Sequence, residues 1–185
     1  VVRAYAEDEF GNRSDEMPPF GLMIDRSTLY VDARGRPGAS GAPDDPMPGL
    51  DDAIEAAQRA GKRFVYVRGS SSIGRAVVVG GRLEVRGGFD ERWNEAPSIN
   101  ADVSVRVPPT SSSYAFVVDG GELALSSISF SLKADGAGGL VLARSGSLEV
   151  DRCSISATGG IEVSAVRSTG ADVTVSSSIL RASSV

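Results

Sequence analysis

The sequence predicts an all-β solenoid, specifically a right-handed parallel β-helix of about six coils with an N-terminal capping α-helix. Apolar residues recur at a step of 25 residues: Leu123, Leu148 and Val173; Leu125, Val150 and Val175; Phe130, Ile155 and Leu180. Around these positions apolar and polar residues alternate, as in short strands with one buried face. Ser, Gly and Asp fill the positions between them, which is typical of tight corners.

Two other repeat architectures fit these observations less well. Leucine-rich repeats need a Leu-x-x-Leu-x-Leu-x-x-Asn frame, and no Asn stands in the three late repeats, residues 120–183. Propeller blades need four strands and roughly 40 residues each. A parallel β-helix needs only short strands, polar corners and inward stacks of Val, Leu and Ile, and these are present.

Residues 1–26 precede the predicted solenoid. The opening "VVRAYAEDEFGNRSDE" alternates and then enters a turn, and it resembles the penultimate strand and following turn of a fibronectin type III or bacterial Ig-like domain. We assign residues 1–26 to the remnant strand and linker of such a module; a lone strand that pairs with the edge of the solenoid is the alternative. Residues 27–185 are assigned to the β-helix, which we expect to continue past Val185.

A strand–loop–helix–strand unit comes next. Strands are predicted at Leu29–Asp32 and Phe64–Val67, with a Gly/Pro/Ala/Ser-rich loop at 34–48 and a helix at about 49–60. One helix face is apolar: Leu50, Ala53, Ile54 and Ala57. Asp51 and Asp52 suit the positive end of the helix dipole, and Gly61 suits its C-terminal stop. We expect this helix to cap one end of the stack.

The remaining strands are marked by pairs of apolar residues. The series runs Val65/Val67, Leu83/Val85, Val103/Val105, Leu123/Leu125, Leu148/Val150 and Val173/Val175, with spacings of 18, 20, 20, 25 and 25 residues. Within each late repeat the order is a turn, a three-residue strand, two polar residues and a second three-residue strand. Leu123, Leu125, Ile128 and Phe130 are predicted to point inward.

Composition excludes several functions. The net charge is -5, with 24 acids and 19 bases and no basic block, so the footprint of a nucleic-acid-binding protein is missing. No apolar run is long enough to span a bilayer. The chain has no His, which excludes Ser-His-Asp and Cys-His catalysis and His-ligated zinc. The single Cys153 shares a repeat position with Ile128 and Ser178, which favours a small buried side chain over a reactive thiol.

Two stretches carry a family resemblance. "LYVDARGRPGASGAPDDPMPGLDDAIEAAQRAGKRFVYVRG" and "AVVVGGRLEVRGGFDERWNEAP" together cover Leu29 to Pro97. They resemble the opening of secreted bacterial right-handed β-helix proteins of the pectin-lyase-like superfamily. The resemblance implies a parallel β-helix located outside the cell or on the bacterial cell surface. It implies no particular chemistry, because the superfamily includes lyases, hydrolases, adhesins and proteins without known activity.

Enzyme mechanisms on this fold find little support in the residues. A polygalacturonase-like site needs Gly-His-Gly, which is absent. A calcium-dependent lyase needs several acids and a basic residue on one face, and the late-repeat candidates are Asp135, Asp151 and Asp172 with Arg152. Asp151 aligns with Ser126 and Ser176 in the neighbouring repeats, so no acidic ladder forms. We assign no catalytic residue.

Two candidate binding sites remain open. Asp32, Asp44 and Asp45 supply carboxylates that suit calcium, although Asp-Asp-Pro before a helix is also a common turn and capping cluster. Apart from calcium at these residues, no cofactor is expected. Phe89 and Trp93 form either an aromatic platform for a sugar ring or a packed cover over the first coils.

The favoured function is therefore a noncatalytic secreted or cell-surface module with a structural, adhesive or carbohydrate-contacting role. The alternative is a fragment of a polysaccharide lyase or glycoside hydrolase whose active site lies partly beyond Val185. An open C-terminal coil would also expose apolar surface and strand edges, which predicts self-association through that end.

Overall fold

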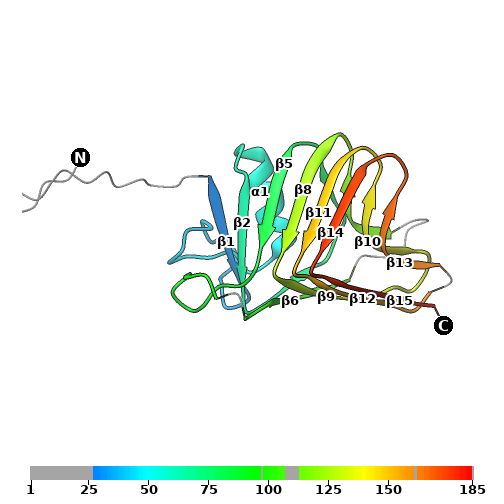
Figure 1. Cartoon of the computed structure of the whole chain (residues 1–185). Coiled ribbons are helices and arrows are strands. Elements are labelled where there is room, and N and C mark those ends of the chain that lie inside the picture. The colour runs from blue at the N-terminus through cyan, green and yellow to red at the C-terminus, as the bar shows by residue number, and fades with distance from the viewer. Residues whose placement is uncertain (1–26, 97, 107–112, 161, 185) are drawn as a thin grey trace, which may run out of the picture.

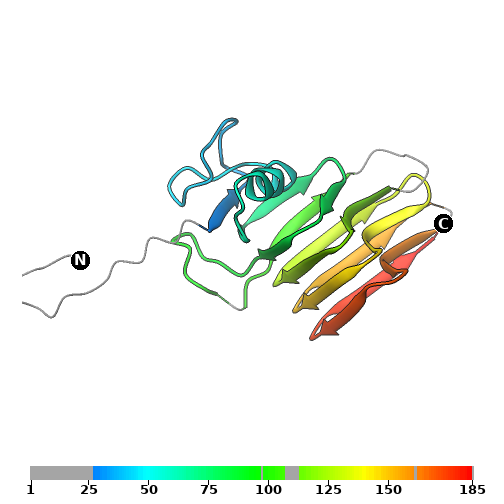
Figure 2. The ribbon, with the colours of Figure 1, turned by 90° about the horizontal axis from the view of Figure 1, so that it is seen from above.

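The computed structural model describes residues 27–96, 98–106, 113–160 and 162–184. The expected upstream strand and linker, residues 1–26, lie outside the described residues. Three parallel β-sheets and one short α-helix make up the described part of the chain (Figures 1 and 2). This arrangement is consistent with a parallel β-helix.

The strands of each sheet come from successive passes of the chain. The six-stranded sheet contains β1 (Thr28–Asp32), β2 (Phe64–Arg68), β5 (Arg82–Arg86), β8 (Gly121–Ser126), β11 (Gly146–Asp151) and β14 (Asp172–Ser176). The five-stranded sheet contains β3 (Ser70–Ile73), β6 (Ala101–Val105), β9 (Ile128–Lys133), β12 (Ser154–Thr158) and β15 (Ile179–Ser183). The four-stranded sheet contains β4 (Val77–Val79), β7 (Ser113–Val118), β10 (Gly138–Ala143) and β13 (Val163–Ser168).

The strand register confirms the 25-residue step. Leu148 pairs with Leu123 on one side and with Val173 on the other. The same step joins Ile155 to Phe130 and to Leu180. The residues predicted to point inward are buried: Leu123, Leu125, Ile128 and Phe130. Identical repeat positions therefore lie directly over one another.

Two details of the predicted repeat are wrong. The first two late repeats contain three strands rather than two, because β10 follows β9 and β13 follows β12. Val103 does not continue the series of Leu83 and Leu123, which pair directly with each other; it lies on β6 in the five-stranded sheet and pairs with Ser71 and Phe130. Apolar and polar residues alternate in the same way on β5, in the six-stranded sheet, and on β6, in the five-stranded sheet, so the alternation does not reveal which of these sheets a strand joins.

Helix α1 (Leu50–Arg59) matches the expected helix and packs against β1 to β4. Its predicted apolar face is fully buried: Leu50, Ala53, Ile54 and Ala57. Gly61 adopts the left-handed conformation, with φ 64°, and ends the helix. Arg75, after β3, holds the outer side of the helix through Asp52 at 2.8 Å and Glu55 at 2.9 Å. Within the described residues no helix has the length and apolarity needed to cross a membrane.

The opposite end of the molecule is formed by β13, β14 and β15, the last strands of their sheets (Figure 1). Val173 is 38% exposed and Val175 is 44% exposed, although Leu148 and Val150 at the same repeat positions are buried. The expectation that Val175 points into a closed interior is therefore not met. Each of these strands has a neighbour on one side only among the described residues.

The corner between the six- and five-stranded sheets repeats with the same geometry. Ser127, Arg152 and Ser177 have φ values of 54°, 50° and 48°. This left-handed conformation is unfavourable for residues with a Cβ atom. The corner therefore recurs every 25 residues even though its side chains differ.

Candidate functional site

The outer face of the six-stranded sheet carries long charged side chains on two strands that are not adjacent. On β5 the inward residues Leu83 and Val85 are buried, so Arg82, Glu84 and Arg86 face outward. On β11 the inward residues are Leu148 and Val150, and the outward side chains are Ser147, Glu149 and Asp151. Strand β8 lies between β5 and β11.

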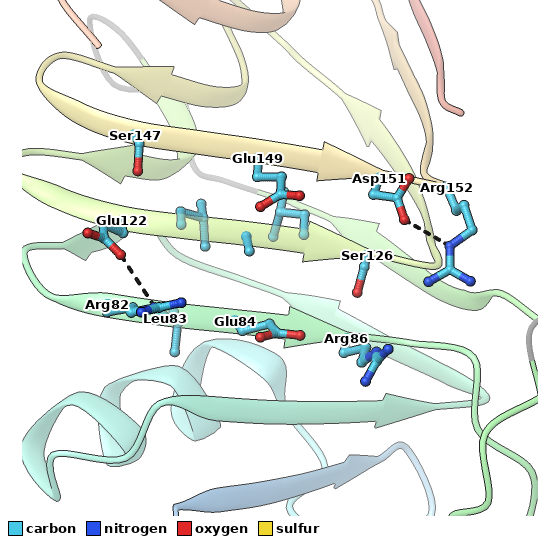
Figure 3. Close-up of a pocket in the computed structure, with 13 residues that line it drawn as sticks. Arg82, Leu83, Glu84, Arg86, Glu122, Ser126, Ser147, Glu149, Asp151 and Arg152 are labelled. Atoms are coloured by element: carbon cyan, nitrogen blue, oxygen red, sulfur yellow. Dashed lines mark hydrogen bonds and ion pairs between the residues drawn. The ribbon is translucent and has the colours of Figure 1, made fainter. Parts of the chain in front are cut away.

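Two of the three outward residues of β8, Ala124 and Ser126, are small, and this makes a hollow beside Glu122. Ala124 pairs with Glu84 and Glu149, and Ser126 pairs with Arg86 and Asp151. Because neighbouring strands are about 4.8 Å apart, the longer side chains on both sides rise as walls above Ala124 and Ser126. The result is an open hollow of about 250 Å³ on the outer face of the sheet (Figure 3).

Charged groups of both signs line the hollow, and several of them are paired. Arg82 lies 3.4 Å from Glu122, and Arg152 lies 2.9 Å from Asp151. The hydroxyl of Ser176, which donates a hydrogen bond of 2.8 Å to Asp151, and the guanidinium of Arg152 hold the pKa of Asp151 below its usual range. These contacts stabilise the ionised form of Asp151.

Two other carboxylates in the hollow, those of Glu84 and Glu149, have no partner of this kind in the described part of the chain. Within the described residues, the side chains of Glu84 and Glu149 have neither a hydrogen bond nor an ion pair. They face each other across Ala124 (Figure 3 shows both). They are available to accept hydrogen bonds from a bound molecule.

The carboxyl ends of the strands bring two guanidinium groups near a buried hydroxyl. Arg86 comes from β5 and pairs with Glu95 at 3.0 Å, while Arg152 comes from the corner after β11. Ser126 lies between them in Figure 3. Its Oγ is buried and is the one buried side-chain polar atom in the described residues without a hydrogen-bond partner. A buried hydroxyl without a partner is unfavourable.

Phe89 and Trp93, the predicted sugar platform, belong to an aromatic cluster over β1 and β2. Phe89 is 5% exposed and stacks on Tyr66 with 4.6 Å between ring centroids. Trp93 is half-buried; its Nε1 donates to the carbonyl of Pro43 at 2.9 Å, and the Arg68 guanidinium lies 4.2 Å from its ring. This is the packed arrangement that the sequence offered as the alternative. Contact of Trp93 with a sugar stays a prediction.

Asp32, Asp44 and Asp45, the predicted calcium ligands, do not converge. Asp32 is buried and accepts hydrogen bonds from Arg68 at 2.6 Å and from Arg34. Burial raises the pKa of Asp32, but the bonds from Arg34 and Arg68 outweigh it and lower the pKa overall. Arg36 and the backbone N–H of Ser40 lower the pKa of Asp45 to about 2.

Asp44 is exposed and has no such partner among the described residues. In the part of the chain that the structure describes, no three His, Cys, Asp or Glu side chains gather as a metal site would require. Calcium binding at these residues stays a prediction.

Most of the hollow could not be predicted from the sequence alone. Asp151 and Arg152 enter the sequence analysis only as part of a missing acidic ladder, and Glu84, Arg86 and Glu149 are not candidates there. The sequence does indicate which residues on the three strands face outward, because they alternate with apolar residues. These residues predict a hollow only once the register that places β5, β8 and β11 side by side is known.

Comparisons of the chain with protein-family models, with curated proteins and with solved structures return no match. The function is therefore inferred from the geometry and chemistry of the residues.

Proposed function

We propose that this chain is a noncatalytic module of a secreted or cell-surface protein, built as a right-handed parallel β-helix of about six coils, which contacts carbohydrate. The coil number is supported by the six strands of the largest sheet and the handedness by the general preference of parallel crossovers. Location outside the cell is supported by the resemblance of Leu29 to Pro97 to secreted β-helix proteins of the pectin-lyase-like superfamily.

The observation that carries the carbohydrate proposal is the hollow over Ala124 and Ser126. Sugar hydroxyls donate and accept hydrogen bonds. The hollow offers carboxylates that accept, on Glu84 and Glu149, and guanidinium groups that donate. Its three arginines and four acids nearly balance in charge, which favours an uncharged sugar over an acidic one.

The experiment fills the hollow without changing its charges. The intact chain is screened by calorimetry against soluble hexasaccharides of glucose, xylose, mannose and galactose, and the best binder is titrated against Ala124→Met. The matched control is Thr174→Met, at the same register position on β14 but outside the hollow. Ala124→Met should weaken binding about tenfold or more, and Thr174→Met should not. Equal effects of the two variants would contradict the proposal.

A second candidate, a glycoside hydrolase, is favoured by Glu84 and Glu149. These two carboxylates lie on strands separated by one strand, so their backbones are about 9.5 Å apart. Paired carboxyl groups of inverting glycosidases are about 6.5–9.5 Å apart. Release of reducing ends from the bound hexasaccharide, abolished in Glu84→Gln and in Glu149→Gln, would support hydrolysis. Binding without any release would reject it.

Self-association through the β13–β14–β15 end is also proposed. Four exposed apolar side chains support it: Val173, Val175, Ile179 and Leu180. Apolar surface beside unpaired strand edges favours pairing with further strands. Sedimentation should show a mass that rises with concentration and falls in Val175→Lys; a constant mass equal to one chain would exclude self-association.

A further inference from the structure

The outer face of the five-stranded sheet differs from the hollow in its chemistry. Small hydroxyl side chains occupy most of its outward positions: Ser70, Ser72, Ser104, Ser129, Ser131, Ser154, Ser156 and Thr158. All of them are exposed or half-buried. We call the outward-facing residues of β3, β6, β9, β12 and β15, together with Arg106 directly after β6, the serine face.

The register arranges these hydroxyls in straight rows. Ser72 pairs with Ser104, Ser104 with Ser131, and Ser131 with Ser156. Neighbouring hydroxyls in this row are therefore about 4.8 Å apart, and the next row lies about 6.7 Å away along the strands. Figure 1 shows β6, β9, β12 and β15 side by side along one face of the molecule. A regular array of donors and acceptors suits a polymer that carries many hydroxyl groups.

The serine face also collects the unpaired positive charges of the protein. Most arginine and lysine side chains in the described residues contact a carboxylate, a carbonyl or an aromatic ring. Those for which the structure shows no such contact within the described residues are Arg92, Arg106, Lys133 and Arg181. Three of these four lie on the serine face, although the whole chain has a net charge of -5.

Two of these cations are direct neighbours. Val105 pairs with Leu132, so the following residues, Arg106 and Lys133, lie next to each other on adjacent strands. Like charges in this arrangement repel each other and destabilise a sheet. Asp102 is the acid on the same face, and it lies four residues before Arg106 on β6, about 13 Å away. An anion bound between Arg106 and Lys133 would remove the repulsion.

A depression of about 270 Å³ lies at this pair. Its polar lining consists of two cations and four hydroxyls: Arg106, Lys133, Ser104, Ser131, Ser156 and Thr158. No carboxylate lines it; Asp102 and Asp135 are both outside. The lining therefore consists of hydrogen-bond donors with a positive charge. A sulfate or phosphate ester has three acceptor oxygen atoms and a carboxylate has two, so the ester can accept hydrogen bonds from more of these donors.

We propose that the depression at Arg106 and Lys133 binds a tetrahedral oxyanion ester, sulfate or phosphate, carried on a hydroxyl-rich polymer whose hydroxyls contact the serine rows. The anion is held by the two cations and by Ser131 and Thr158. The polymer extends along the row that includes Ser104 and Ser156. This site is separate from the hollow over Ala124, so it does not depend on the function proposed for that hollow.

The test compares polymers that share one backbone. The intact chain is titrated with dextran, dextran sulfate, dextran phosphate and carboxymethyl dextran of equal charge density. We expect binding to dextran sulfate or dextran phosphate that weakens as salt screens the charges, and binding at least about tenfold weaker to the other two polymers. The sulfate and phosphate titrations distinguish the two esters. Equal binding to carboxymethyl dextran, or no binding to either ester, would overturn the proposal.

A pair of variants then tests the location. Arg106→Gln with Lys133→Gln should lower the affinity for the bound ester polymer at least about tenfold. Arg92→Gln removes an unpaired cation away from the serine face and should change the affinity less than about twofold. Ala124→Met, in the hollow, should leave it unchanged. If Arg92→Gln weakens binding as much per charge removed as the double variant does, the polymer is attracted to positive charge anywhere on the surface. The proposed site would then not exist. Both side chains are exposed and their repulsion is removed, so the double variant should unfold at the same temperature or a higher one; such a result excludes misfolding as the cause of weaker binding.

Discussion

The two ends of the stack present the same repeat in opposite environments. At one end α1 covers the interior, and its residues Leu50 and Ile54 are fully buried. At the other end Val173 and Val175 are 38% and 44% exposed, although they pair in register with the buried Leu148 and Val150. The difference shows that the position of a residue within the repeat does not by itself determine whether the residue is buried. Burial depends on whether another strand layer or the helix lies over it.

The largest expected contrast is between the same substitution at an inward position near each end. Leu50→Asp places a charge in the interior that α1 covers and should lower the free energy of unfolding by at least about 4 kcal/mol. Leu180 pairs with the buried Ile155 but is 39% exposed, so Leu180→Asp should lower it by less than about 2 kcal/mol. Urea unfolding of both variants measures the difference. Similar losses would mean that Leu180 is covered in solution.

A smaller contrast compares two repeat positions directly. Val150 and Val175 pair in the register but differ in exposure, 0% against 44%. Val150→Ala should cost about 2 kcal/mol through lost burial and a cavity, and Val175→Ala less than about 0.5 kcal/mol. If Val175→Ala lowers the free energy of unfolding as much as Val150→Ala does, but only at high protein concentration, then self-association covers this end of the stack.

Thiol chemistry reports the same contrast without unfolding the protein. Cys153 is buried, and burial raises its pKa to about 11. Its repeat equivalent Ser178 is only half-buried. In a Cys153→Ser background, the thiol of Ser178→Cys should react with a disulfide reagent at pH 8 at least about tenfold faster than Cys153 does in the unmodified chain, because a lower pKa leaves more thiolate. Equal rates would show that the last repeat is packed as tightly as the others.

The smallest expected effect concerns a feature that both regions share. The corner residues Ser127 and Ser177 have nearly the same φ, 54° and 48°, so the backbone strain does not depend on the covering layer. Ser177→Gly should stabilise the chain by up to about 1 kcal/mol, since glycine accepts positive φ. Ser177→Ala keeps the strain and serves as control. Thermal unfolding that ranks Ala above Gly would contradict this assignment.

Much of the fold could be predicted because its signals are local. The helix at Leu50–Arg59 follows from its apolar face and from Gly61, and the late repeat follows from the 25-residue step. The strands β3, β4, β7, β10 and β13 were not predicted. β10 consists entirely of buried positions, including Gly138 and Gly139, so it lacks the alternation that predicts a strand.

The candidate sites were harder to predict, because side chains far apart in the sequence form them. Glu84 and Glu149 become neighbours across one strand only after three sheets have formed. Arg106 and Lys133 are ordinary surface cations in the sequence, and only the register places them side by side. The ion pairs of Asp32 with Arg34 and Arg68 could not be predicted either, because Arg68 lies 36 residues further along the chain.

The amino-acid sequence by itself determined the repeat: which residues alternate, at what step they recur, and where glycine and the helix interrupt them. These properties depend on backbone geometry and side-chain polarity within a few residues. The tertiary structure alone decided which copies of the repeat are buried, which small residues form the floor of a hollow, and which charges lack a partner. Each of those outcomes depends on what lies about 4.8 Å away on the neighbouring strand, and that neighbour comes from a distant part of the chain.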